Sequence, residues 1–255
     1  MTTGKTTRTV SPSARYLLYA LGEITLVVIG ILIALQINNW NEARKNTQEE
    51  TQILLSLKED LLKNKENLLW TIDMERTTIW QKELLIGIFE AYHISAQKED
   101  FITEQIDSLS LYLNHGAVAF FREELVTGTF DALIGAGKVG LIRNQRLSRS
   151  MAEYSTEIKS GFEDHDSQIN LQNILFEKIS PYIRPLWPWT KNSYSTFYIE
   201  ESTKRKAAAD FLRDTSIEGI LLRKVFGERL RIKRQRKLLN DTNALLDLVE
   251  EELGT

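Results

Sequence analysis

The chain has 255 residues, a formal net charge of −3 and no cysteine, and 26% of its residues are charged. The near-neutral balance gives no overall attraction to nucleic acid, and a chain without cysteine has no disulfide, thiolate metal site or cysteine nucleophile. The charged and hydrophobic shares are ordinary for a folded chain, and the length suits one or two helical domains beside a membrane segment.

Residues 1–15 form a short polar head with three basic side chains, Lys5, Arg8 and Arg15, and no acid. The head is too short and too polar to fold by itself. Because Lys and Arg beside a membrane helix favour the cytoplasmic side, we predict a cytoplasmic head and a location across the membrane for residues 41–255. A reporter fused at the carboxyl terminus that is active only in the cytoplasm would contradict this orientation.

Residues 16–40 form the most apolar stretch, which is uninterrupted from Leu17 to Leu35 except for Glu23 and Thr25. A helix of that length crosses a hydrocarbon core of roughly 30 Å. The run is also longer than the apolar region of a usual signal peptide. We therefore predict a single transmembrane helix over residues 16–40.

Glu23 is the informative residue of this helix, because a carboxylate inside a bilayer usually faces protein or water. At 100° per residue, Val27, Gly30 and Ala34 lie on the same face, and the two small residues allow close approach of a second helix. Three interpretations remain open: the acid reaches the membrane interface, this face associates with another helix, or the acid handles protons. Association predicts that Gly30→Leu disrupts assembly more than Glu23→Gln.

Two stretches carry a resemblance to a known family. The run YALGEITLVVIGILIALQINNWNEARK, residues 19–45, closely resembles the amino-terminal signature of a large family of uncharacterised bacterial single-span membrane proteins, a domain of unknown function. The run TFDALIGAGKVGLIRNQRLSRSMAEY, residues 129–154, resembles that family's second recurring block. The resemblance implies a bacterial inner-membrane protein with a periplasmic helical region, and it implies no activity.

Beyond the membrane stretch, apolar residues recur at helical spacing. A long helix is predicted over residues 49–91, and the absence of proline and glycine between Trp40 and Gly87 lets the transmembrane helix continue into it. Leu54, Leu61 and Leu68 recur every seven residues, as in a coiled coil, and a second leucine set widens this face toward a helix buried in a bundle: Leu55, Leu62 and Leu69.

Shorter helices are predicted over residues 100–114, 120–136, 144–179 and 203–213, followed by a last long helix over 217–253 that opens at Ser216. The fold class is therefore all-α, and the helices 49–91 and 217–253 should pack antiparallel. The basic middle of the last helix, residues 223–237, should face acids such as Glu59 and Asp60.

No motif assigns chemistry to the chain. The glycines of GAGKVG, residues 135–140, match no phosphate-binding fingerprint and indicate a turn between helices. Neighbouring positions on a helix point in different directions, so Glu163, Asp164, His165 and Asp166 cannot converge on one metal ion. We predict no catalytic residue, cofactor or metal.

Residues 180–202 interrupt every helical period and hold three of the four prolines. The aromatic side chains of this predicted loop include Trp187, Trp189, Tyr194, Phe197 and Tyr198. Either the loop caps the bundle, or it recognises a partner or the membrane. In the second case, alanine at both tryptophans should weaken partner contacts.

These features predict a non-enzymatic, membrane-anchored interaction, scaffold or sensor protein, with itself or another membrane protein as partner and no nucleic acid. The alternative is a subunit of an ion-coupled membrane complex that uses Glu23, and an unassigned enzyme comes third. Finding Glu23 beside another subunit's polar span would favour the alternative, whereas a fully functional Glu23→Gln variant would exclude it.

Overall fold

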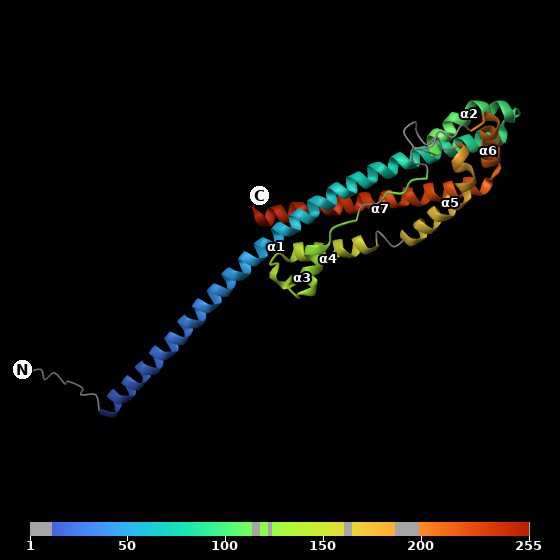
Figure 1. The fold of residues 1–255 in the computed structure, drawn as a ribbon. Coiled ribbons are helices and arrows are strands. Elements are labelled where there is room, and N and C mark those ends of the chain that lie inside the picture. The colour runs from blue at the N-terminus through green and yellow to red at the C-terminus, as the bar shows by residue number, and fades with distance from the viewer. Residues whose placement is uncertain (1–11, 114–117, 122–123, 161–164, 187–198, 255) are drawn as a thin grey trace, which may run out of the picture. The chain divides into compact units, whose positions relative to one another are not determined.

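The computed structural model of this chain describes residues 12–113, 118–121, 124–160, 165–186 and 199–254. Within these residues the regular structure is helical, without a strand (Figure 1). The elements are α1 (Pro12–Ile94), α2 (Lys98–Tyr112), α3 (Gly128–Gly135), the short 3-10 turn η2 (Val139–Leu141), α4 (Gln145–Ser160), α5 (His165–Leu186), α6 (Glu201–Arg213) and α7 (Thr215–Leu253). The chain divides into two units, residues 1–53 and 54–255.

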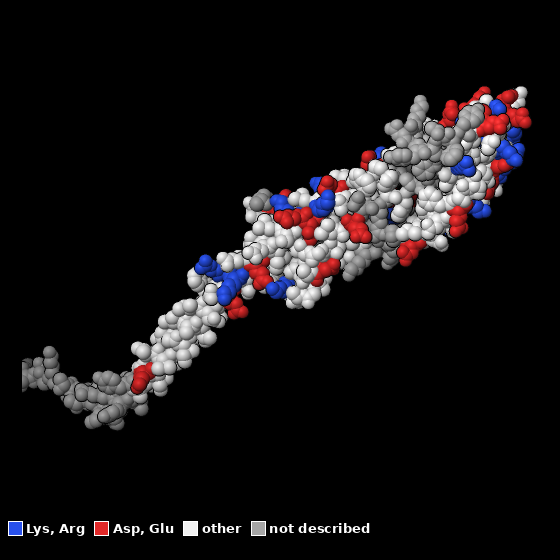
Figure 2. Space-filling model, in the orientation of Figure 1, with Lys and Arg blue, Asp and Glu red and all other residues white. Residues whose placement is uncertain are grey.

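The first unit consists of the amino-terminal part of α1. Every residue from 20 to 48 is exposed, including the apolar run from Ala20 to Leu35. Figure 2 shows this part of the helix as an almost uncharged surface. Among the described residues, α1 is the helix whose length and composition would let it cross a membrane, and none of its most apolar stretch is buried. A membrane span or a signal sequence has these properties.

In the second unit, α1 from residue 54 onward lies beside α7, and the two helices run antiparallel (Figure 1). Two ion pairs and one hydrogen-bond contact that join them show the direction: Lys58–Glu250, Lys82–Glu228 and His93–Glu218. The residue number rises along α1 as it falls along α7. The predicted antiparallel packing of these helices is therefore confirmed, and Leu54, Leu61 and Leu68 are buried in it.

The second leucine set of α1 does not lie inside the bundle. Leu55, Leu62 and Leu69 are 50%, 48% and 50% exposed, so the prediction that they widen the buried face is wrong. Each follows a buried leucine by one residue and is therefore turned about 100° from it. The neighbouring helices cover only one side of α1, and this rotation carries the second set to the other side.

Residues 120–127 were predicted to be helical, but the described part of this segment is not, and the helix here, α3, begins at Gly128. Two asparagines of α1 explain the difference. Asn64 Nδ2 donates to the Val126 carbonyl at 2.9 Å, the Val126 N–H donates to Asn64 Oδ1 at 2.6 Å, and Asn67 Nδ2 donates to the Glu124 carbonyl at 2.8 Å. These side chains satisfy backbone groups that a helix would otherwise pair.

The predicted helix over residues 144–179 is instead two helices, α4 and α5, and residues 161–164 between them lie outside the described residues. Asn144, predicted to be the first residue of this helix, lies just before α4, and its Oδ1 accepts hydrogen bonds from two backbone N–H groups of the first turn at 3.0 and 3.1 Å. In a single helix over 144–179 the apolar face through Leu147 and Met151 would also include Ile169 and Phe176, but in α5 these two side chains are exposed, and Leu175 and Ile179 are buried instead. Because α5 is a separate helix, the residues that it buries do not continue the helical spacing of the buried residues in α4.

The carboxyl-terminal part of α5 extends through Pro181 and Pro185, so the predicted loop at 180–202 is wrong as far as Leu186. Pro181 has no N–H for the Glu177 carbonyl, and the Ser180 hydroxyl donates to that carbonyl instead at 2.8 Å. Packing of this turn also compensates, because Leu186 is buried. The helix α7 begins at Thr215, two residues earlier than predicted, and Asp214, not Ser216, caps it by accepting from the Ser216 N–H at 3.0 Å.

Candidate functional site

A group of ionisable side chains lies buried between α1 and α7. We call Glu75, Lys82, Lys224, Glu228 and Arg231 the buried ion cluster, because none is more than 5% exposed. Lys82 and Lys224 approach opposite oxygens of Glu228 at 3.1 and 3.7 Å. Arg231 Nε lies 2.6 Å from Glu75 Oε1. The cluster therefore joins two helices that are far apart in sequence.

An aromatic ring covers part of the cluster. The Lys224 ammonium lies 5.8 Å from the centre of the Phe120 ring, and the Arg231 guanidinium lies 4.9 Å from it. Cations over an aromatic face are attracted by its quadrupole, most strongly where water is absent. Phe120 thus stabilises two cations whose hydration has been lost.

Burial shifts the protonation of the cluster toward neutral forms. Desolvation raises the pKa of Glu75 from 4.5 to about 7, although the charge of Arg231 opposes the shift. Desolvation also lowers the pKa of Lys224 from 10.5 to about 8, and it lowers the pKa of Lys82 against the attraction of Glu228. In each case the loss of water outweighs the ion pair, which is the usual balance for buried charges.

Hydrogen bonding in the cluster is incomplete among the described residues. The Lys82 and Lys224 ammonium groups lie within ion-pair distance of Glu228 without forming a well-directed hydrogen bond. Two cavities described below include none of these five side chains in their walls. The cluster therefore links α1 to α7 inside the bundle. It also fixes the register of the two helices, because a shift of one along the other would leave buried charges unpaired.

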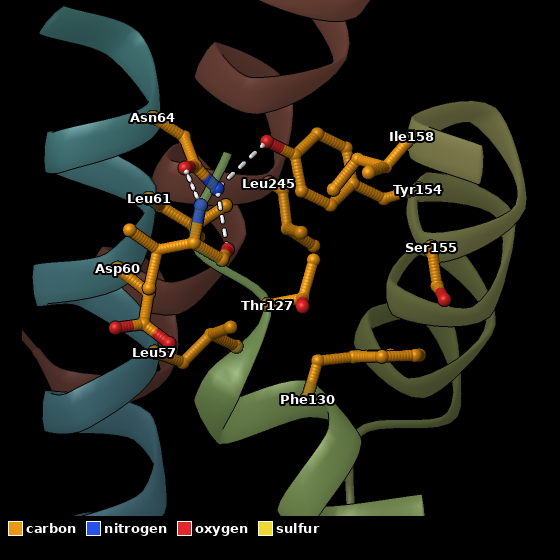
Figure 3. A pocket seen from close by; sticks show the side chains of 11 residues that line it. Leu57, Asp60, Leu61, Asn64, Thr127, Phe130, Tyr154, Ser155, Ile158 and Leu245 are labelled. Carbon is orange, nitrogen blue, oxygen red and sulfur yellow. Dashed lines mark hydrogen bonds between the residues drawn. The ribbon is translucent and has the colours of Figure 1, made fainter. Parts of the chain in front are cut away.

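A second polar site joins α1, α4 and α7 around Asn64 (Figure 3). Besides its two bonds to Val126, Asn64 Nδ2 donates to the Tyr154 hydroxyl at 3.4 Å, and that hydroxyl lies 2.9 Å from Thr242 Oγ1. The adjoining cavity has a volume of about 10 Å³. That space suits a single water molecule and excludes a substrate, so this site is structural.

An open groove of about 510 Å³ lies between α5 and α7. Its apolar wall consists of three exposed side chains of α7 at four-residue spacing: Leu222, Phe226 and Leu230. Gly227 marks a close approach of the two helices, because a Cβ there would lie 2.7 Å from Gln168 Nε2. Sequence reasoning missed this groove, although the four-residue spacing beside arginines was a visible signal.

The residues predicted to associate in the membrane, Glu23, Val27, Gly30 and Ala34, all lie in the exposed part of α1. A Cβ added at Gly30 would meet nothing within 4 Å. Their association with another helix remains a prediction. The predicted partner surface, Trp187, Trp189, Tyr194, Phe197 and Tyr198, lies outside the described residues.

The basic stretch of α7 was predicted to face Glu59 and Asp60, and the structure shows different partners. Arg229 pairs with Glu83 at 2.5 Å, and Lys237 pairs with Glu157 of α4. Asp60 instead accepts a hydrogen bond from the Thr129 N–H at 3.0 Å. In the described ranges no three His, Asp or Glu side chains gather as metal ligands would, and Glu163 and Asp164 lie outside those ranges.

Comparison with known proteins identifies one match. The model of a family of unknown function, DUF6090, matches residues 23–157, which is just over half of the chain. The matched region runs from Glu23 through most of α4 and includes two of the five residues of the buried ion cluster, Glu75 and Lys82. No curated protein and no solved structure matches the chain.

Proposed function

Since this chain belongs to the DUF6090 family, whose function is unknown, we propose on physical grounds that it is a membrane-anchored helical interaction protein without enzyme activity. One observation carries the proposal: an entirely exposed apolar helix precedes a unit with its own buried core. That combination supports an anchor and a separate helical domain, and the cavity of about 10 Å³ beside Asn64 is too small for a substrate.

The energetics favour insertion of the exposed run into a bilayer. Between Leu21 and Ile37, eleven Leu, Ile and Val side chains are at least 47% exposed. On an insertion scale they contribute about 3 to 7 kcal/mol, against about 3 kcal/mol for one acid at the helix centre. Glu23 lies near one end of the run, where the cost is lower.

The proposed location is the bacterial inner membrane, with the head in the cytoplasm and residues 41–255 in the periplasm. The acid-free basic head supports this orientation. The proposed contact within the membrane is the face of Glu23, Val27, Gly30 and Ala34, which meets a second copy or another membrane protein. We propose no nucleic-acid partner.

Membrane fractionation with an alkaline wash tests the anchor. The full chain should stay in the membrane pellet, whereas a variant with Val28→Lys and Leu32→Lys should become extractable, because each lysine at the helix centre costs about 3 kcal/mol. Recovery of the unchanged chain in the soluble fraction would refute the anchor.

Cysteine crosslinking tests the contact within the membrane, and the chain has no cysteine of its own to interfere. Gly30→Cys should crosslink in membranes, and Val28→Cys, on another face, should not. Equal crosslinking at both positions, or none at either, would show that the helix acts only as an anchor. Gly30→Leu should disrupt the contact more than Glu23→Gln, because packing contributes more than one hydrogen bond.

A second candidate function is a subunit of an ion-coupled complex. The observation that favours it is the carboxylate of Glu23, which is exposed within an apolar surface that only membrane or protein would cover. A Glu23→Gln variant that assembles and supports normal growth under ion-gradient stress would exclude this role and leave the interaction protein in place.

A further inference from the structure

The side of α1 that faces away from the bundle in the second unit has a regular composition. Leu55, Leu62 and Leu69 are about half exposed and recur every seven residues, and Trp80, 58% exposed, lies in the same direction. At 100° per residue these four side chains lie within about 40° of one another around the helix. We call them the outer stripe. A surface leucine by itself needs no explanation, but three leucines at seven-residue spacing, followed eleven residues later by a tryptophan on the same side, have the spacing of a helix–helix seam.

Charged residues border the outer stripe with opposite sign on its two edges. Three residues after the first two leucines come Lys58 and Lys65, about 60° to one side. Four residues after each leucine comes an acid, about 40° to the other side, and these acids are Glu59, Glu66 and Asp73. One edge is thus basic and the other acidic.

This arrangement is complementary to itself. When two such helices pair parallel about a twofold axis along the seam, the basic edge of one faces the acidic edge of the other. An antiparallel pair would bring like edges together, acid against acid and lysine against lysine. We propose that the outer stripe of α1 is the seam of a parallel homodimer, with a second copy of this chain as its partner.

Existing surface ion pairs do not oppose this contact. Lys58 pairs with Glu250 at 2.8 Å, and Glu66 pairs with Lys63 at 2.7 Å, and these side chains are partly or largely exposed. Exposed pairs of this kind contribute little and rearrange readily. The seam lies entirely within residues 54–255 and does not depend on the face of Glu23 and Gly30, so it extends the proposed function with a separate surface.

Oxidative crosslinking of the full chain in membranes tests the seam. Single variants Leu55→Cys and Leu69→Cys should each form a disulfide-linked dimer at least about tenfold faster than Ser56→Cys, because only the stripe brings equivalent Cβ atoms within disulfide distance. Ser56 is a matched control, since it is exposed on the same helix about 100° away from Leu55.

Each outcome has a defined meaning. Rates at Leu55→Cys and Leu69→Cys no higher than at Ser56→Cys would overturn the seam, even where Gly30→Cys still crosslinks and the membrane contact stands. A mixed disulfide between Leu55→Cys and Leu69→Cys chains, without dimers of either alone, would show antiparallel pairing and overturn the proposal. Strong stripe crosslinking without Gly30→Cys crosslinking would support the seam and refute self-association through Gly30 in the membrane.

Charge reversal tests the choice of partner. Both charge variants are made in chains that carry Leu69→Cys. Lys65→Glu makes both edges of the outer stripe acidic beside this cysteine, and Glu66→Lys makes both edges basic. Because like charges would then face each other across the seam, each variant alone should crosslink several-fold more slowly. Expressed together, the two variants should restore the original rate as a mixed dimer. Unchanged rates in each single variant would show that the edges do not face a second copy.

Discussion

Changing Glu75 to glutamine should remove a pH dependence of stability that originates in the buried ion cluster. In the unfolded chain this carboxyl loses its proton near pH 4.5, and in the folded chain near pH 7, because burial disfavours the charged form. Between these values the folded state holds one proton that the unfolded state has released. The free energy of unfolding therefore falls as the pH rises through this window.

The size of the effect follows from the shift. A difference of about 2.5 pKa units corresponds to about 3 kcal/mol, fully lost by the time the pH passes 7. Lys224 acts in the opposite direction at higher pH, because its folded pKa of about 8 lies below its ordinary 10.5. Above about pH 8 the unfolded state binds the extra proton, and stability rises again. The least stable range should lie between pH 7 and 8.

Urea unfolding of the full chain, followed by circular dichroism at intervals from about pH 4.5 to pH 7.5, measures this dependence. Glu75→Gln should flatten the decline, since glutamine resembles the protonated acid in shape and does not titrate. Glu83→Gln is the matched control, because Glu83 forms a partly exposed pair with Arg229 on the same two helices. A decline of unchanged size in Glu75→Gln would refute the assignment of the pH dependence to this carboxyl.

Asn64→Ala should lower the free energy of unfolding by about 2 to 4 kcal/mol, because it leaves both backbone groups of Val126 without their partner; a thermal melt unchanged by the substitution would contradict this. Lys82→Met should cost about 3 kcal/mol in urea unfolding, since Glu228 loses its nearer cation inside the bundle. Leu147→Ala should cost about 2 to 5 kcal/mol, because its side chain is fully buried, and equal stability of this variant and the unchanged chain would show that the α4 face is misplaced.

Much of the fold followed from periodicity. The seven-residue recurrence of Leu54, Leu61 and Leu68 correctly indicated a long buried helix, and the continuous helical pattern of the last 40 residues correctly indicated its antiparallel partner. Periodicity describes one helix at a time, however. It could not show that Leu55 faces away from the bundle, because that depends on how many neighbours cover α1.

The buried ion cluster was harder to foresee. Lys224 and Arg231 belong to a strongly basic stretch, and such stretches usually face solvent. Their burial depends on the register between α1 and α7, which places Glu75 of α1 beside Arg231, and no local pattern contains that information. The same limit applies to the segment around Val126, which was wrongly predicted to be helical. The asparagine that binds the backbone of Val126 lies 62 residues earlier in the chain, so the local sequence could not reveal this contact.

The position of the buried ion cluster also bears on how the protein is made. Glu75 and Lys82 leave the ribosome long before their partners, since Arg231 follows Glu75 by about 150 residues, or about 10 to 30 seconds at usual rates of synthesis. During that interval water must hydrate the α1 charges, and the surrounding leucines have no α7 to cover them. The helices α1 and α7 can pack together only after α7 has been synthesised, so we expect the nascent chain to depend on chaperones until then.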